Sequence, residues 1–188
     1  MSIILHNDRV ELSLPVTAAL IAFASKDTTR PHLGIGFQDG RLNATDGHTL
    51  LSFDDTCART DEASMDRRML RRVIDGKVWS RAHVETALKV ARAQKAPVVR
   101  LMYADALPDQ KLPPVTQAIP TYGVEPSEPI KFNPDYFARM SLAAKACGEE
   151  GAVLINAKGE LDPVGFLVGD RGKLGLSARV VVMPMRRD

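Results

Sequence analysis

Asp46 and His48 are the residues of this 188-residue chain best placed to act as a catalytic acid and base, because they flank Gly47 in one short turn. A carboxylate beside an imidazole can move a proton near neutral pH. In a simpler interpretation the aspartate closes an Asp-Gly turn and the histidine faces a surface. No motif adds a nucleophile to the pair. The sequence therefore favours the turn and predicts no catalytic residues; a small hydrolase that uses Asp46 and His48 is the alternative.

Other chemical signatures are weaker still. The glycines of residues 34–40 fall within a predicted hairpin, whereas a nucleotide loop needs a strand, a glycine turn and a helix in that order. The His-x-Glu at 83–85 lacks the Pro-Cys-x-x-Cys of a zinc deaminase. Cys57 and Cys147 stand alone, without metal-ligand spacing. We expect no cofactor and no metal.

Composition sets broad limits on partners and location. The chain has 25 lysines and arginines against 23 aspartates and glutamates, and this small excess permits nucleic-acid contact without requiring it. No stretch reaches the ~20 apolar residues of a membrane helix. The first residues lack the features of a signal peptide. Two isolated cysteines are typical of a reducing compartment, so we expect a cytoplasmic protein.

The elements around Asp46 follow from local patterns. Residues 15–25 carry no charge after Pro15, which predicts a helix buried on most sides. Asp-Gly steps at 39–40 and 46–47 divide the next stretch into three short apolar segments. Asp-Gly between such segments is a strong hairpin signal, so we predict a three-stranded meander.

Two more helices are predicted before the middle of the chain. Residues 80–95 have an apolar stripe of Val84, Leu88 and Ala91, and a strand at 97–103 follows. Residues 64–76 could form a helix with Met65, Met69 and Val73 inside. Its four outer arginines, Arg67, Arg68, Arg71 and Arg72, are interpreted as a solvated face in preference to a phosphate-binding patch.

Six prolines make residues 107–130 an extended connector. The next helix is predicted to start at Asn133 as its cap and Pro134, and to end at Gly148. Its inner stripe would be Phe137, Met140, Ala144 and Cys147. Strands at 152–156, 163–169 and 178–183 complete an α+β fold, in which helices pack on antiparallel meanders and an αβββ unit is repeated.

Two stretches together resemble one family. "LNATDGHTLL", around Asp46, and "VVVMPMR", near the last residue, are similar to segments of bacterial DNA polymerase III β sliding clamps. Residues 10–25, 78–91, 119–126 and 130–140 resemble the same proteins more loosely. The resemblance implies a DNA-clamp fold. It also implies that residues 1–125 correspond to the middle clamp domain and residues 126–188 to the second half of the last domain.

In that family the two motifs line a hydrophobic groove that captures short peptides of polymerases and repair proteins. The corresponding groove residues here are Leu33, Thr45, Gly47, His48, Leu50, Pro120, Val124, Val181, Val182, Met183, Pro184, Met185 and Arg186. The resemblance implies sequence-independent contact with duplex DNA, for which the sequence offers Arg81, Lys89, Arg92, Lys95, Arg139 and Lys145.

The chain departs from the family in length and at one groove position. It is about half as long as a three-domain clamp chain, so a closed ring needs more copies than two. Thr49 replaces the family's arginine, which predicts a different peptide preference. We expect a homo-oligomeric ring that tethers a polymerase or repair protein to DNA; the alternative is a module that binds or sequesters clamp-binding peptides without forming a ring.

Overall fold

The computed structural model describes residues 2–27, 29–30, 33–54, 58–60, 67–108, 110–119, 123–124, 132–157, 162–169 and 176–184. A four-stranded sheet has the order β6-β1-β2-β8 and consists of β6 (Ala58–Thr60), β1 (Ile3–Leu5), β2 (Arg9–Ser13) and β8 (Val98–Met102). An eight-stranded sheet has the order β7-β3-β4-β5-β12-β11-β10-β9. Its strands are β7 (Val78–Trp79), β3 (Ile35–Gln38), β4 (Arg41–Thr45), β5 (Thr49–Phe53), β12 (Ala178–Val182), β11 (Val164–Val168), β10 (Ala152–Ala157) and β9 (Gly123–Val124).

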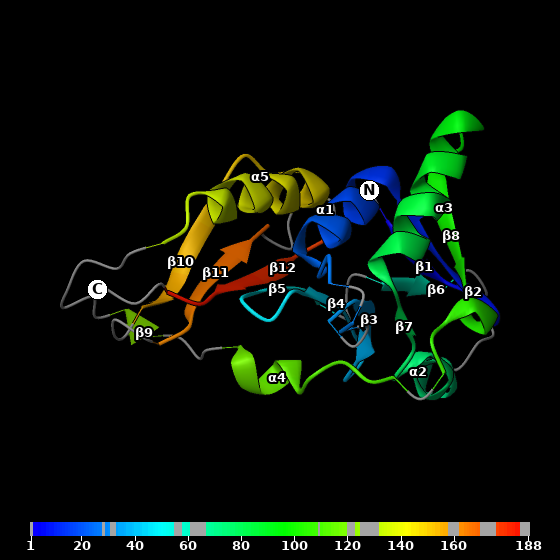
Figure 1. The fold of residues 1–188 in the computed structure, drawn as a ribbon, viewed down its shortest axis with the longest axis horizontal. Coiled ribbons are helices and arrows are strands. Elements are labelled where there is room, and N and C mark those ends of the chain that lie inside the picture. The colour runs from blue at the N-terminus through cyan, green and yellow to red at the C-terminus, as the bar shows by residue number, and fades with distance from the viewer. Residues whose placement is uncertain are drawn as a thin grey trace.

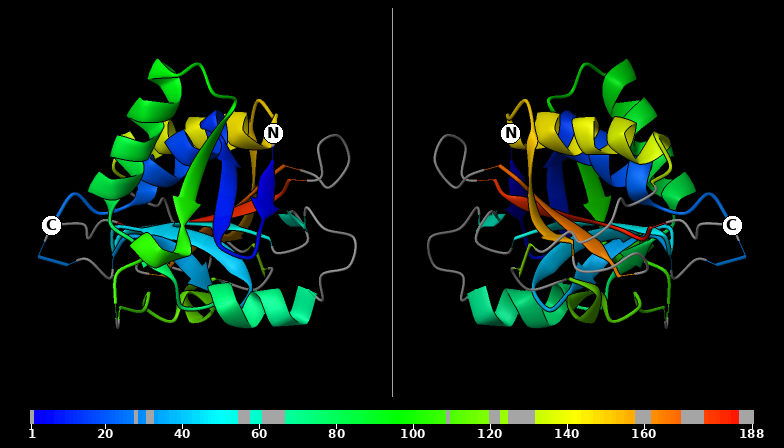
Figure 2. Two further views of the ribbon diagram at one scale, coloured as in Figure 1. Left: turned by 90° about the vertical axis from the view of Figure 1, so that its right-hand side faces the viewer. Right: turned by 90° about the vertical axis from the view of Figure 1, so that its left-hand side faces the viewer.

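The helices are α1 (Leu14–Phe23), α2 (Arg67–Ile74), α3 (Arg81–Ala93), α4 (Val115–Ala118) and α5 (Asp135–Cys147). Helices α1 and α5 lie side by side on one face of the long sheet, and α3 continues the helical layer over the four-stranded sheet (Figure 1). Figure 2, which looks along the long axis from both ends, shows α1 and α5 above the strands and α2 below them. The predicted α+β class, with helices on antiparallel meanders, is confirmed.

Two helix-and-meander units build the centre of the molecule. Helix α1 precedes β3, β4 and β5, and α5 precedes β10, β11 and β12. The last strands of the two units pair antiparallel, with Val180 opposite Leu51. The long sheet is therefore continuous across the predicted division at residues 125 and 126, which lies outside the described residues and stays a prediction.

Helix α1 is buried on most sides, as its lack of charge predicts. It contacts α3, α5 and strands of both sheets. Val16, Leu20 and Phe23 have no exposed surface. A helix enclosed in this way cannot place a charged side chain without desolvating it, which accounts for its composition.

Two predicted apolar stripes are wrong in part. Met69 and Val73 of α2 are 67 % and 50 % exposed, whereas Ile74 at the end of the helix is buried. The predicted stripe of Met69 and Val73 therefore does not face the core. Met65 lies outside the described residues. In α5, Phe137 is 53 % exposed and packs edge-on against Phe132.

The small residues of α5 form its real inner face. Ala143 and Ala146 are fully buried, together with the predicted Ala144 and Cys147, because α5 packs closely against α1. The predicted ends of the helix are confirmed. The Asn133 side chain accepts a hydrogen bond from the backbone N–H of Asp135, and Gly148 has a left-handed φ of 78°.

The connector is more structured than predicted. Within residues 107–130, Val115–Ala118 form the single helical turn α4, and Gly123–Val124 form β9. Pro114 precedes α4 directly, a position where proline is tolerated because the first N–H groups of a helix have no intrahelical partner. Proline density therefore excluded long elements here but not short ones.

Among the described residues, no helix is long and apolar enough to cross a membrane.

Candidate functional site

The turn between β4 and β5 is closed by the side chain of Asp46. Its Oδ1 accepts hydrogen bonds from the backbone N–H groups of His48 (3.0 Å) and Thr49 (2.7 Å), and from the Thr49 hydroxyl (2.9 Å). Gly47 has a φ of 88°, which a side chain would strain. The prediction that the aspartate makes the turn and that His48 is exposed is confirmed.

An arginine from the second unit fixes this turn of the first. Arg139 of α5 donates to Asp46 Oδ2 and, over 2.9 Å, to the Thr49 hydroxyl. Its guanidinium also lies over the ring of Tyr136. Burial works to raise the pKa of Asp46, but the bonds from Arg139 and the backbone outweigh it and keep that pKa below its usual value. Asp46 is thus ionised, and it stabilises the turn through its hydrogen bonds.

The end of β12 closes onto the same turn. Strand β12 pairs with β5 up to Val182 opposite Thr49, and the N–H of Met183 then donates to the carbonyl oxygen of His48 over 2.9 Å. Met183 is 39 % exposed, and Pro184 after it is half-buried. Two segments more than 130 residues apart in sequence therefore meet where strands β5 and β12 end, at the exposed turn.

The predicted groove residues divide into a buried set and an exposed set. Leu33, Thr45, Leu50, Val181 and Val182 are buried, whereas Gly47, His48 and Met183 are exposed. Leu33 touches the turn, because its Cδ1 would lie 3.5 Å from a Cβ at Gly47. Pro120, Met185 and Arg186 lie outside the described residues.

Val124 is not brought to the turn. It belongs to β9, which lies three strands from β12 in the sheet order β12-β11-β10-β9. Neighbouring strands are about 4.8 Å apart, so the separation is roughly 14 Å.

The chain's own connector covers the apolar side chains next to the turn. Leu50 and Val181 form a small cluster with Leu112 and Val78, against which Leu107 and Ile119 also pack. Sequence reasoning missed these connector residues. The available signal was their apolar character, since Leu107, Leu112 and Ile119 interrupt an otherwise polar and proline-rich stretch.

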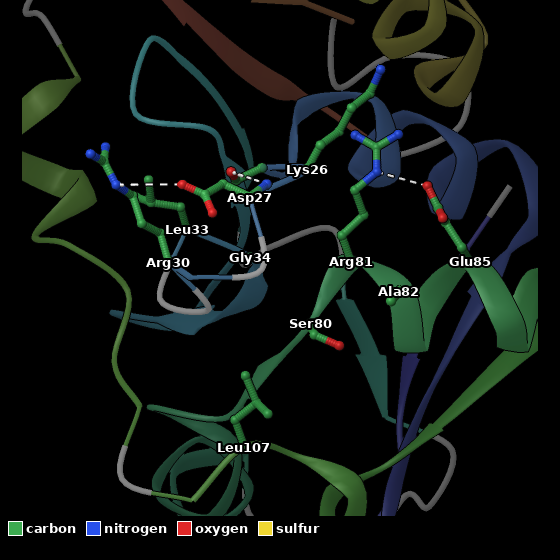
Figure 3. Close-up of a pocket in the computed structure, with 11 residues that line it drawn as sticks. Lys26, Asp27, Arg30, Leu33, Gly34, Ser80, Arg81, Ala82, Glu85 and Leu107 are labelled. Atoms are coloured by element: carbon green, nitrogen blue, oxygen red, sulfur yellow. Dashed lines mark hydrogen bonds and ion pairs between the residues drawn. The ribbon is translucent and has the colours of Figure 1, made fainter.

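A cavity of about 590 Å³ also borders Leu33. It is formed by the segment after α1, the first turn of α3 and Leu107 (Figure 3). Lys26, Arg30 and Arg81 line it together with Asp27 and Glu85. This cavity shares Leu33 with the predicted groove.

Of the six basic residues predicted to contact DNA, two are bound within the protein and four are exposed. Arg81 donates to Glu85 over 2.7 Å and to the carbonyl oxygen of Ala24 over 2.8 Å, so it joins α3 to the end of α1. Arg139 is bound to Asp46. The others are exposed on the helical side of the molecule; they are Lys89, Arg92, Lys95 and Lys145.

Within the described part of the chain, no cluster of three or more histidine, cysteine, aspartate or glutamate side chains could hold a metal ion. Comparison of the sequence with known protein families and with curated proteins returns no match.

Proposed function

We propose that this protein is a small processivity factor with a DNA-clamp fold, which captures short peptides of a polymerase or repair protein at the meeting point of the 46–49 turn and the β12 tail. One observation carries the proposal: the Met183 N–H binds the His48 carbonyl oxygen. The two stretches that resemble sliding clamps are far apart in sequence, so their resemblance supports a shared site only if they lie together. They do lie together.

The side chains at the 46–49 turn and the end of β12 suit a peptide partner. Met183 presents a flexible thioether beside the exposed His48, and Leu33 provides apolar surface below Gly47. A methionine at a binding surface adapts to several side-chain shapes. Asp46 and Arg139 fix the turn from behind, so a peptide would meet a preorganised backbone.

The proposal includes a head-to-tail ring around duplex DNA in the cytoplasm. Within the described residues β8 pairs on one side only, and Ala152–Leu154 of β10 extend beyond the residues that β9 pairs. These two edges lie at opposite ends of the molecule (Figure 1). Val153 and Leu154 on β10 are 64 % and 38 % exposed. An apolar open edge is a ready site for strand pairing with another copy.

A second candidate is a peptide-binding module that forms no ring. It is favoured by the internal bonds of Arg81 and Arg139, which leave fewer cations on the helical face for phosphate contacts. The mass in solution separates the two candidates: a clean monomer at micromolar concentration contradicts the ring, whereas a closed oligomer supports it.

The peptide site is tested by replacing Met183 and Pro184 with alanine. Binding of a fluorescent, Gln-Leu-rich clamp-binding peptide is measured by anisotropy. We expect the peptide affinity to fall at least tenfold, because the variant lacks the exposed thioether of Met183 and the backbone restriction that Pro184 imposes. Met69→Ala is the matched control, since this methionine is also exposed but belongs to α2. Equal peptide affinity in all three proteins would exclude this site.

A further inference from the structure

The cavity beside the proposed peptide site has a mixed lining. Leu33 and Leu107 provide apolar surface, and five charged side chains surround them. Among the lining residues that the structure describes, three are cations and two are carboxylates, which leaves one positive charge in excess. In the view of Figure 3 the ammonium group of Lys26 and the guanidinium of Arg81 extend in the same direction.

The two carboxylates are already committed to arginines. Asp27 lies 3.7 Å from Arg30, and Glu85 lies 2.7 Å from Arg81. Lys26 forms no ion pair with another described residue. This lysine therefore supplies the excess positive charge of the lining. An anion entering the cavity would meet it without first displacing a neighbouring carboxylate.

The start of α3 adds partial positive charge to the same cavity. Ser80 caps the helix, and its hydroxyl accepts a bond from the His83 N–H. Arg81 and Ala82, which line the cavity, are in the first turn, where backbone N–H groups have no intrahelical acceptor. This end of a 13-residue helix therefore strengthens the attraction that Lys26 exerts on an anion.

The cavity is contiguous with the proposed peptide site. Leu33 lines the cavity and contacts the turn at Gly47, and the next residue, His48, binds the tail at Met183. A linear peptide that lies across the turn at Met183 passes Leu33 when it continues over Gly47. The cavity would then receive the residues that follow.

We propose that this cavity binds an acidic segment of the same partner peptide, with Lys26 as the residue that selects a carboxylate. The inference rests on the proposed function and adds the chemical class of the partner: an apolar motif flanked by aspartate or glutamate. The carboxylate of such a side chain would reach Lys26, while Leu33 and Leu107 offer apolar contacts to other residues of the peptide. Complementary charge of this kind chiefly determines specificity and association rate.

The test uses two pairs of fluorescent, Gln-Leu-rich peptides. One pair is extended at the amino end and the other at the carboxyl end, by Glu-Glu in one member and Gln-Gln in the other. At low salt we expect the wild-type protein to bind one Glu-Glu peptide about tenfold more tightly than its Gln-Gln partner. Lys26→Glu should reverse that preference. Arg72→Glu, which changes an exposed basic residue on α2, is the matched control and should keep it.

The outcomes separate the two proposals. Tight binding of both members of each pair, without preference, overturns the cavity assignment and leaves the peptide site standing. A preference that survives Lys26→Glu also overturns it. Failure of the wild-type protein to bind any of the four peptides overturns the proposed function, and the cavity inference with it.

Discussion

The two faces of the eight-stranded sheet are built from the same strands but bury very different amounts of apolar surface. Val180 and Val182 of β12 face the layer of α1 and α5 and belong to the main core. Val181, between them, faces the opposite side and belongs to the small cluster beneath the connector. Strand geometry imposes this alternation, because successive side chains point to opposite faces.

The same division appears on β5. Leu51 contributes to the main core, whereas Leu50 packs in the small cluster with Leu112. One face is covered by long helices, and over the other lie α2 and a proline-rich connector with a single helical turn (Figure 2). We infer that the helical face provides most of the stability. The connector face, where the proposed peptide site opens, is the one that can adapt to a partner.

The largest expected effect comes from truncating β5 on its helical face. Leu51→Ala should lower the free energy of unfolding by about 3–4 kcal/mol, because rigid helices cannot collapse into the cavity. Leu50→Ala should lower it by about 2 kcal/mol, since the overlying connector can move in. Guanidinium denaturation of both variants measures the difference. Equal losses of unfolding free energy in the two variants would show that the connector is as rigid as the helices. That result would contradict the difference inferred between the two faces.

A smaller effect is expected where the two faces meet, at the turn that Arg139 fixes. Asp46→Asn should lower the free energy of unfolding by about 2 kcal/mol at pH 7, because hydrogen bonds to a charged group are lost. The folded-state pKa of Asp46 lies below the ordinary value of 3.8. Its contribution is therefore complete above that value and disappears as the pH falls through the folded-state pKa.

Denaturation curves at pH 7 and at pH 3 check this pH dependence. The wild-type protein should approach the variant in stability at the lower pH. Asp162→Asn is the control, because Asp162 is exposed. A gap between wild type and Asp46→Asn that stays constant over this range would mean that the carboxylate charge does not contribute to the turn.

Most elements could be predicted from the sequence because their signals are local. Asp-Gly steps located both turns of the β3–β4–β5 meander, and Asn133 with Gly148 located the ends of α5. The burial of α1 followed from its lack of charge. Each of these features depends on residues within one element or one turn.

The predictions were wrong where packing between distant segments determines which side chains are buried. Met69 and Val73 are exposed although their spacing predicts an inner stripe, and α5 packs against α1 through alanines while Phe137 is exposed. The contact of Leu112 with Leu50 links the connector to a strand some 60 residues earlier, and no local pattern encodes it. The meeting of His48 and Met183 was accessible only through the resemblance of two separate motifs.

The smallest effect on stability, and a large effect on function, is expected on the outer surface of the helical face. Simultaneous change of Lys89, Arg92 and Lys95 to glutamate should alter the free energy of unfolding little, since substitutions at exposed sites usually stay within about 0.5 kcal/mol each. If the ring surrounds DNA with this face inward, the variant should lose retention on circular duplex DNA. The dependence of log K on log salt should become shallower by about 3 if the three residues contact phosphates.

The control reverses charge on the opposite side of the molecule. Arg72→Glu with Lys111→Glu changes exposed residues on α2 and the connector, and retention on DNA should persist. Loss of retention in the control alone would place the DNA on the connector face. The face that we assign to stability would then be free of any partner, and the peptide and the DNA would have to share the other.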